Sequence, residues 1–341
     1  MFERHTHRTF FVFLALLTVT AFVHRAPAQT LSIGDPAPAL QVVKWESGGP
    51  VNLAAARGTR MHVIEFWAPH CAQSVDRLFN LNDLQAKYRD KLTVVSIAEG
   101  SPEAVKDRLA EKKLEVNFAL TCDDYQGNAE VYMAAVGAQG IPYTFVVDRD
   151  GLIAWHGPPG HGVGKVLEAM FAGTYTVETG REILTHEASL GGALMAEQWK
   201  AALLLIDRLI QMDPNPLRYQ MLKFNVLSDG KKDAEAAKAF APVLLTALPH
   251  YLDLDDFARG LLSGDLGEDY YDLALTFCKA AYEASGGDKK DIAHSYARAM
   301  FLNGDIQGAV RLEKRALELA GGDDVFLRMT LNKYEKAAKK P

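Results

Sequence analysis

The stretch that decides the fold of this chain is MHVIEFWAPHCAQSVD, residues 61–76. Its first half, residues 61–67, is apolar and rich in β-formers, which predicts a buried central strand. The apolar positions that follow have the spacing of one helix face: Val75, Leu78, Leu81 and Leu84. Cys71 therefore stands at the predicted start of a helix, directly after a strand.

Cys71 occupies a place where a thiol can be activated. The first turn of a helix has unpaired backbone N–H groups and the positive end of the helix dipole, and both favour thiolate over thiol. The alternative is a buried, inert cysteine. Three residues further on stands Ser74, so the sequence predicts a reactive cysteine without a second thiol beside it.

The first 28 residues predict a signal peptide. Two arginines precede an apolar stretch at residues 10–23, and residues 26–28 (Ala-Pro-Ala) form a small-x-small cleavage pattern. We therefore expect an exported protein, periplasmic or otherwise extracytoplasmic, that begins near Gln29. An uncleaved anchor is the alternative, and only then would the protein contact the membrane.

Charge and cysteine content exclude several classes. The 341 residues carry 37 Lys and Arg against 43 Asp and Glu, with no basic stripe, so we expect no nucleic-acid partner. Three scattered cysteines, at 71, 122 and 278, are too few for a disulfide scaffold. Cys278 lies in an apolar helical pattern and is expected in a core.

Residues 31–174 alternate between strand and helix patterns, which predicts an α/β domain. A hairpin is expected first, with strands at residues 40–45 and 51–53 around a Gly-Gly-Pro turn. The expected strands that follow are 61–67, 92–98, 117–121, 143–148 and 152–156. The expected helices are 71–88, 102–113, 127–136 and 163–172.

Three segments of this domain resemble the thioredoxin superfamily, and within it the exported TlpA/ResA-like redoxin branch. They are Gly34-Asp35-Pro36-Ala37-Pro38, Glu65-Phe66-Trp67-Ala68 leading into Cys71, and Gly140-Ile141-Pro142 before Phe145-Val146-Val147-Asp148. The resemblance implies a thioredoxin-like fold, with Cys71 as the attacking thiolate. It also implies a cis-proline at Pro142 facing that cysteine and a buried acid at Glu65.

The neighbours of Cys71 each allow two interpretations. His70, when protonated, would stabilise the thiolate, or it is an exposed turn histidine without a role. Backbone groups beside Pro142 would pair with an extended substrate chain, or the proline serves the turn alone. Glu65 would have no second thiol to deprotonate and is then a buried acid kept neutral by desolvation.

Ser74 limits the functional prediction, because a dithiol oxidoreductase needs a second cysteine to resolve its mixed disulfide. A small thiol could resolve it, as in monothiol glutaredoxin-like proteins with a CxxS motif. Cys122 could do so from the end of a neighbouring parallel strand, if the two Cα atoms come within about 7 Å. Otherwise the domain has lost redox turnover and binds partners.

Two other activities are disfavoured. Peroxiredoxins carry proline seven and threonine three residues before their cysteine, where this chain has Ile64 and Ala68. A copper site of Cys71 with His156 or His161 would resemble Sco-type chaperones, but those use two cysteines, and surface histidines are the better explanation. We expect neither metal nor cofactor.

Residues 181–341 lack strand patterns and repeat at about 35 residues. Equivalent small residues fall at Ala202, Ala237, Ala274 and Ala309. Seven residues later come Leu209, Leu244, Ala281 and Ala316, and twelve later Pro214, Pro249, Gly286 and Gly321. This period resembles tetratricopeptide-like helical hairpins, with residues 325–338 as a terminal helix that presents a polar face. Such a stack presents a concave surface for a protein partner, or serves packing and dimerisation.

Two hypotheses follow from these patterns. The first is an exported thiol-disulfide oxidoreductase with a monothiol Cys71-x-x-Ser74 site, whose clients are protein thiols or disulfides and whose repeats bind a protein partner. The second is a redox-inactive scaffold in which both domains bind protein.

Overall fold

The computed structural model describes residues 30–123, 127–158, 162–248, 250–263 and 266–339. The predicted signal peptide and His161 lie outside them. The first domain is built on a six-stranded sheet of order β1-β4-β3-β2-β5-β6. Its strands are β1 (Trp45–Ser47), β2 (Met61–Trp67), β3 (Leu92–Glu99), β4 (Ala119–Asp123), β5 (Tyr143–Val147) and β6 (Ile153–Gly157). Its helices are α1 (Ala72–Lys87), α2 (Pro102–Glu111), α3 (Asn128–Val131), the 3₁₀ turn η1 (Ala134–Val136) and α4 (Val163–Ala172).

Strand β2 lies in the middle of this sheet and is buried along its whole length. It pairs in parallel with β3 and antiparallel with β5, and β3 pairs in parallel with β4. Met61, Val63 and Trp67 of β2 pack into a core with α1 and α4, whereas Ile64 and Phe66 pack into a second core on the other face. Both faces are covered, which explains the continuous apolar run in the sequence.

The expected N-terminal hairpin is wrong. Residues 51–53 form no strand, and β1 instead pairs antiparallel with β4, placing Trp45 opposite Thr121. The open edge of β4 supplies backbone partners that a hairpin would otherwise need. The Ser47 hydroxyl donates to the Phe118 carbonyl, which further ties this segment to β4.

The rest of the described chain is helical. Its elements are α5 (Val177–Met195), α6 (Trp199–Met212), α7 (Leu217–Asn225), the π-helical turn η3 (Val226–Gly230), α8 (Ala234–Ala247), α9 (Tyr251–Leu262), the 3₁₀ turn η4 (Glu268–Tyr270), α10 (Tyr271–Ala284), α11 (Lys290–Leu302), α12 (Ile306–Leu319) and α13 (Val325–Ala338). Helices α6, α8, α10 and α12 have 14 residues each, and their fourth and eleventh residues are fully buried. These are the small and apolar positions of the sequence period, and Cys278 is buried among them in α10.

The first helical pair is packed onto the α/β domain. Apolar residues of α5 and α6, including Ile183 and Ile206, belong to the same core as β2 and α1. A side chain at Gly180 would bring its Cβ within 3.0 Å of the Ala154 carbonyl, so glycine lets α5 lie against β6. The predicted start of the second domain at residue 181 therefore lies inside α5, with no flexible linker before it.

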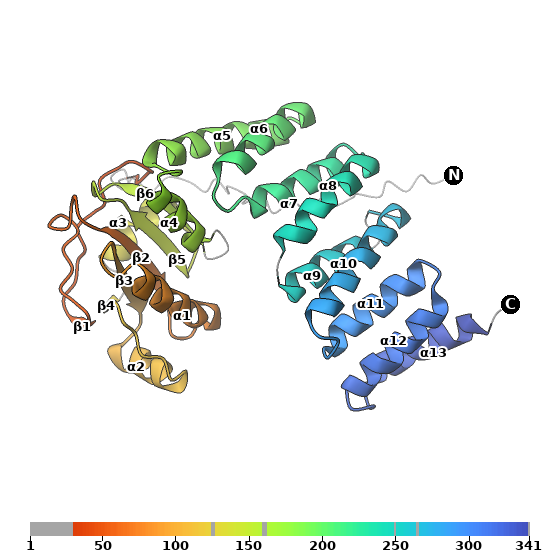
Figure 1. Cartoon of the computed structure of the whole chain (residues 1–341). Coiled ribbons are helices and arrows are strands. Elements are labelled where there is room, and N and C mark those ends of the chain that lie inside the picture. The colour runs from red at the N-terminus through yellow and green to blue at the C-terminus, as the bar shows by residue number, and fades with distance from the viewer. Residues whose placement is uncertain (1–29, 124–126, 159–161, 249, 264–265, 340–341) are drawn as a thin grey trace, which may run out of the picture.

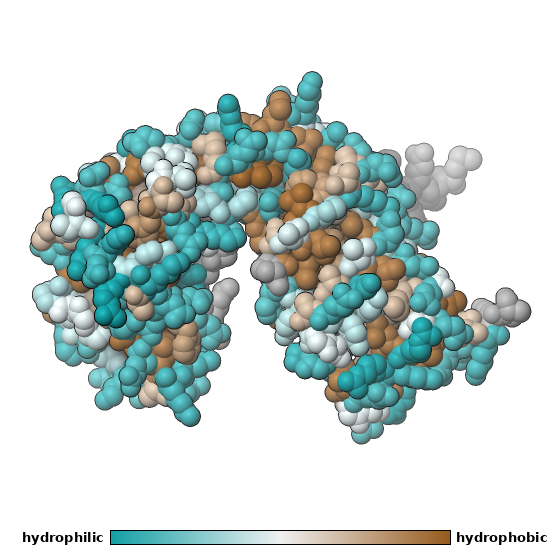
Figure 2. Space-filling model, in the orientation of Figure 1, coloured by the Kyte–Doolittle hydropathy of each residue, from teal (hydrophilic) through white to brown (hydrophobic). Residues whose placement is uncertain are grey.

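The helices continue away from the sheet as a curved array, so the molecule forms an arch with the α/β domain at one end and α13 at the other (Figure 1). A hollow separates the two ends, and apolar surface gathers around α7 and α8 in the part of the array beside it (Figure 2). Contrary to the expected polar-faced terminal helix, α13 exposes Val325, Phe326 and Met329. Within the described ranges, no helix has the length and apolar character needed to cross a bilayer.

Candidate functional site

Cys71 is the N-cap residue of α1 and is a free, partly exposed cysteine. Its backbone is extended, with φ −91° and ψ 108°, and its carbonyl accepts the first helical hydrogen bond from Val75. The Cys71 side chain makes no capping hydrogen bond. Sulfur at this position therefore stands at the positive end of α1, beside backbone N–H groups of the first turn.

Pro142 lies beside the strand that leads to Cys71. The Ile141–Pro142 peptide bond is cis. The β2–β5 register pairs Phe66 with Tyr143, and one further step places Pro142 next to Trp67, four residues before Cys71. Cys71 and Pro142 thus both follow from strands that end at the same end of the sheet.

Glu65 is completely buried and ion-paired. The Arg77 Nε donates to its Oε1 at 2.8 Å, and the Thr144 hydroxyl donates to Oε2 at 2.5 Å. The Arg77 Nη2 also donates to Thr144 Oγ1 at 2.9 Å. Burial raises the pKa of the Glu65 carboxyl, and the charge and hydrogen bonds of Arg77 oppose that shift. The sequence predicted that Glu65 would be desolvated, but it did not predict the ion pair with Arg77.

Ser74 occupies the third position of α1, one turn beyond Cys71. Its side chain is fully buried, and its Oγ has no hydrogen-bond partner among the described residues. Residues three apart on a helix have Cβ atoms about 5–6 Å from each other, so Ser74 stands one turn from Cys71 on the same side of α1. A buried donor without a partner costs roughly 1–3 kcal/mol.

Cys122 lies at the end of β4, as the sequence predicted, but two strands away from β2. The registers align Cys122 with Ala98 of β3, and Ala98 with Trp67 of β2. Cys122 and Trp67 are therefore two strand spacings apart, about 9.6 Å. Cys71 lies four residues beyond Trp67 in the chain. Burial, with the charge of Glu46, raises the pKa of the Cys122 thiol to about 11. Both observations disfavour Cys122 as the resolving thiol.

His70 is exposed and lines an open depression of about 430 Å³ between the end of β3 and α2. Glu99 and Arg108 line the same depression. Burial raises the pKa of the Glu99 carboxyl, and His70 opposes that shift by its charge. The imidazole thus shares this depression with an acid.

His156 differs from the surface histidine that the sequence predicted. It pairs with the Tyr143 hydroxyl through Nδ1 at 2.8 Å, and burial lowers its pKa to about 4. Strand β6 faces the helical region at this point, where Tyr175 donates to the Ala154 carbonyl. Among the residues the structure describes, no three metal-ligating side chains lie together.

Arg77 and Thr144 are the residues of this site that the sequence reading missed. Both had a detectable signal. Arg77 interrupts the buried face of α1 between Ser74 and Leu78, and Thr144 lies two residues after Pro142, in a strand that pairs with the one carrying Glu65. A buried acid predicts a buried cation or hydroxyl nearby, because an unpaired carboxylate is costly in a core.

Comparison with known proteins agrees with this geometry. Residues 33–156 match the model of the AhpC/TSA family. Protein FixW of Rhizobium leguminosarum is 25% identical over 217 residues, which cover 56% of this chain and 95% of that protein.

Among solved structures, a putative thiol:disulfide interchange protein DsbE from Chlorobium tepidum is 23% identical, with a TM-score of 0.35, over 42% of this chain and 98% of that one. The thioredoxin domain of a thiol-disulfide oxidoreductase from Bacteroides vulgatus is 19% identical, also with a TM-score of 0.35, over 41% and 99%. Taken with the sheet order, the central strand and the helix that starts at Cys71, the family match shows that the first domain has a thioredoxin-like fold, and an all-helical region follows it.

Proposed function

We propose that this protein is an exported thiol-disulfide oxidoreductase that works as a monothiol through Cys71. The observation that carries the proposal is the position of Cys71: a free, partly exposed thiol that caps α1 at the end of the central strand. That position leaves the sulfur partly exposed to a client, at the N-terminal end of α1.

The proposed cycle has two exchange steps. The Cys71 thiolate attacks a client disulfide, forming a mixed disulfide and releasing the second client sulfur as a thiolate. An external thiol then attacks the client sulfur of the mixed disulfide, and Cys71 leaves as a thiolate. Each step makes one S–S bond and breaks one, so no other electron carrier is required.

The surroundings of Cys71 support a cycle completed from outside. Ser74 stands where a resolving thiol would be needed, and a hydroxyl cannot replace it. Arg77 is ion-paired with the carboxylate of Glu65, the group that would otherwise take a proton from such a thiol. We assign Glu65 with Arg77 a positioning role beneath the first turn of α1.

The helical region would recruit the partner protein. We propose that α5 to α12 are tetratricopeptide-like hairpins, supported by the equivalent buried positions of α6, α8, α10 and α12. The hollow between the redoxin domain and the array, with apolar surface beside it (Figure 2), is of a kind that accepts a polypeptide. Export is supported by the predicted signal peptide alone.

A mixed-disulfide trap tests the proposal. The protein would be expressed with its export segment, the cells acidified to stop thiol exchange, and covalent complexes separated without reductant. We expect reductant-sensitive complexes that vanish in Cys71→Ser and persist in Cys122→Ser. Absence of complexes from both the unmodified protein and Cys122→Ser would instead favour the scaffold function, which the serine at position 74 also suggests.

A further inference from the structure

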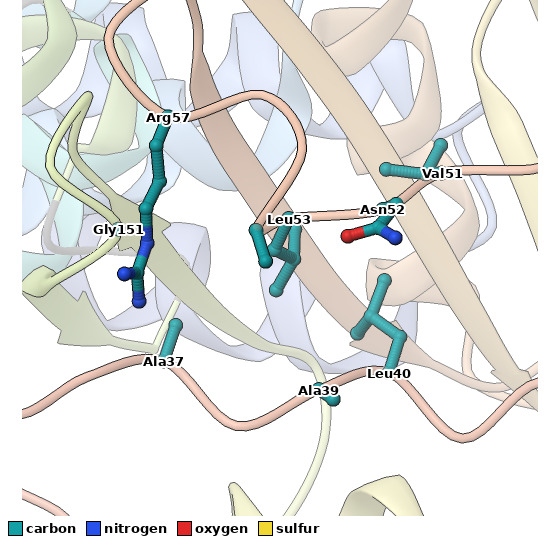
Figure 3. Close-up of a pocket in the computed structure, with 9 residues that line it drawn as sticks. Ala37, Ala39, Leu40, Val51, Asn52, Leu53, Arg57 and Gly151 are labelled. Carbon is teal, nitrogen blue, oxygen red and sulfur yellow. The ribbon is translucent and has the colours of Figure 1, made fainter.

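A second pocket lies at the end of the sheet opposite Cys71. It encloses about 210 Å³ between the segment that leads from residue 37 to 40 and the turn that precedes β2 (Figure 3). Its walls include Ala37, Leu40, Val51 and Leu53. The length of β2, about 20 Å, separates this pocket from the cysteine.

The polar groups of this pocket are donors. The Arg57 guanidinium points down past Gly151 towards Ala37, and the Asn52 amide lies above Leu40, on the other side of Leu53 from Arg57 (Figure 3). Asn52 Oδ1 already accepts a hydrogen bond from the Ala55 N–H, which leaves its amide N–H groups for another partner. No Asp or Glu lines the pocket, and no ion pair to the Arg57 guanidinium occurs among the described residues.

Backbone hydrogen bonds hold the surroundings of Arg57 in place. The Gly58 N–H donates to the Arg149 carbonyl at 2.7 Å, and the Ala37 N–H donates to the Gly151 carbonyl at 2.9 Å. A Cβ on Gly151 would lie 2.6 Å from Arg57 Nε, so the absent side chain makes the channel along which Arg57 runs. The exposed Arg57 side chain thus runs along one side of the pocket.

We infer that this pocket binds a small aliphatic monocarboxylate. The apolar walls would take the hydrocarbon, and the Arg57 guanidinium at one side of the pocket would take the carboxylate, as charge-assisted donors prefer. The volume is sufficient, since a cavity of about 150 Å³ accommodates benzene. A cationic ligand would be repelled by Arg57, and no acid lines the pocket to offset that repulsion. A neutral alcohol would leave the guanidinium without an anionic partner.

The experiment follows backbone amide shifts in ¹H–¹⁵N TROSY spectra of the purified protein during titration with hexanoate, hexylamine or hexanol. We expect saturable shifts confined to residues 37–40, 51–58 and 151 with hexanoate only. Arg57→Gln should weaken hexanoate binding at least tenfold, the effect of losing one charge-assisted contact. Arg57→Lys should retain more of the affinity than Arg57→Gln.

Arg149→Gln is the matched control, because Arg149 is exposed in the neighbouring turn and does not line the pocket. Its affinity for hexanoate should equal that of the unmodified protein. The proposal is overturned if hexanoate produces no saturable shift up to about 10 mM, where even a weak specific site would fill. Equal binding of hexylamine, or unchanged hexanoate affinity in Arg57→Gln with an otherwise native spectrum, would overturn it as well.

Discussion

Arg77 of α1 reaches beneath the first turn of its own helix to pair with Glu65 of β2, Nε to Oε1 at 2.8 Å. The carboxylate has no exposed surface and the arginine side chain is only 12% exposed. The pair therefore joins the active-site helix to the central strand in a nearly dry environment.

Replacing Arg77 by Met should strongly destabilise the protein, because Glu65 would be left as an unpaired buried acid. We expect a loss of about 3–5 kcal/mol in the free energy of unfolding at pH 8. The pKa of Glu65, already raised by burial, would rise further without Arg77. The loss should shrink as the pH falls, since the folded variant can then protonate Glu65.

Urea denaturation of Arg77→Met at pH 8 and pH 5 measures this effect. Arg89→Met is the matched control at an exposed arginine and should change stability by less than about 0.5 kcal/mol. A double variant, Glu65→Gln with Arg77→Met, should be more stable than Arg77→Met alone at pH 8. An equal loss at both pH values would contradict the ion-pair explanation.

The three cysteines should differ sharply in reactivity. Burial raises the pKa of Cys122 to about 11 and that of Cys278 to about 12, so each holds very little thiolate at pH 7.5. Cys71 should be alkylated by iodoacetamide at least about tenfold faster than either. Peptide mass spectrometry over a time course would follow all three, and preferential labelling of Cys122 would contradict the assignment of Cys71 as nucleophile.

His62 should make the protein sensitive to mild acid. It is 1% exposed, neither ring nitrogen has a partner among the described residues, and burial together with Arg60 lowers its pKa to about 4. The pKa of His62 in the folded state lies below its value near 6.5 in the unfolded state. The folded protein therefore keeps its full stability above pH 6.5, where His62 is neutral in both states. That stability is lost progressively as the pH falls towards 4.

His62→Leu removes this loss. Between pH 7.5 and pH 5, the stability of His62→Leu relative to the unmodified protein should improve by about 2 kcal/mol, the free energy of about 1.5 pKa units. Chemical denaturation at both pH values measures the difference, and His156 titrates in both proteins alike. A constant stability difference between the two proteins would contradict the assignment.

Arg181 should hold the helical region against the α/β domain. Its Nε donates to the Ile33 carbonyl at 3.2 Å and its Nη2 to the Gly34 carbonyl at 3.1 Å. Arg181→Ala should increase amide hydrogen exchange along residues 31–36 and the first turns of α5, at a cost of about 1–3 kcal/mol. Arg208→Ala, an exposed substitution on α6, is the control, and unchanged exchange in Arg181→Ala would contradict the anchoring role.

The sequence predicted most elements of the first domain because their patterns are local. The central strand, the active-site helix and α4 lie where periodicity placed them. The prediction of a hairpin was wrong because β1 pairs with a strand about 75 residues away in the chain. Local turn signals cannot reveal the open edge of β4. The packing of α5 against the first domain was missed for the same reason. In the sequence Gly180 is typical of a linker, and only the structure shows that β6 lies against it.

The sequence predicted only those site residues whose place in a family motif also determines their place in the fold. Cys71, Ser74 and Pro142 follow from their places in a familiar order, and the structure puts Cys71 and Pro142 at one end of the sheet. The pairing of Arg77 with Glu65 depends on side chains from two elements meeting in a core, which spacing alone does not specify. His156 was expected at the surface because the contact of β6 with α5 was not foreseen.

The serine at position 74 is the residue on which the monothiol account depends most, and Ser74→Cys tests it most directly. Cysteine is close to serine in size and would fit this buried site. The mixed-disulfide trap should then recover far fewer complexes, because the introduced thiol would resolve the mixed disulfide. The purified variant should form an internal disulfide between Cys71 and the introduced thiol, whereas Ser74→Ala should still be trapped. An undiminished yield of complexes from Ser74→Cys, without that internal disulfide, would contradict the monothiol account.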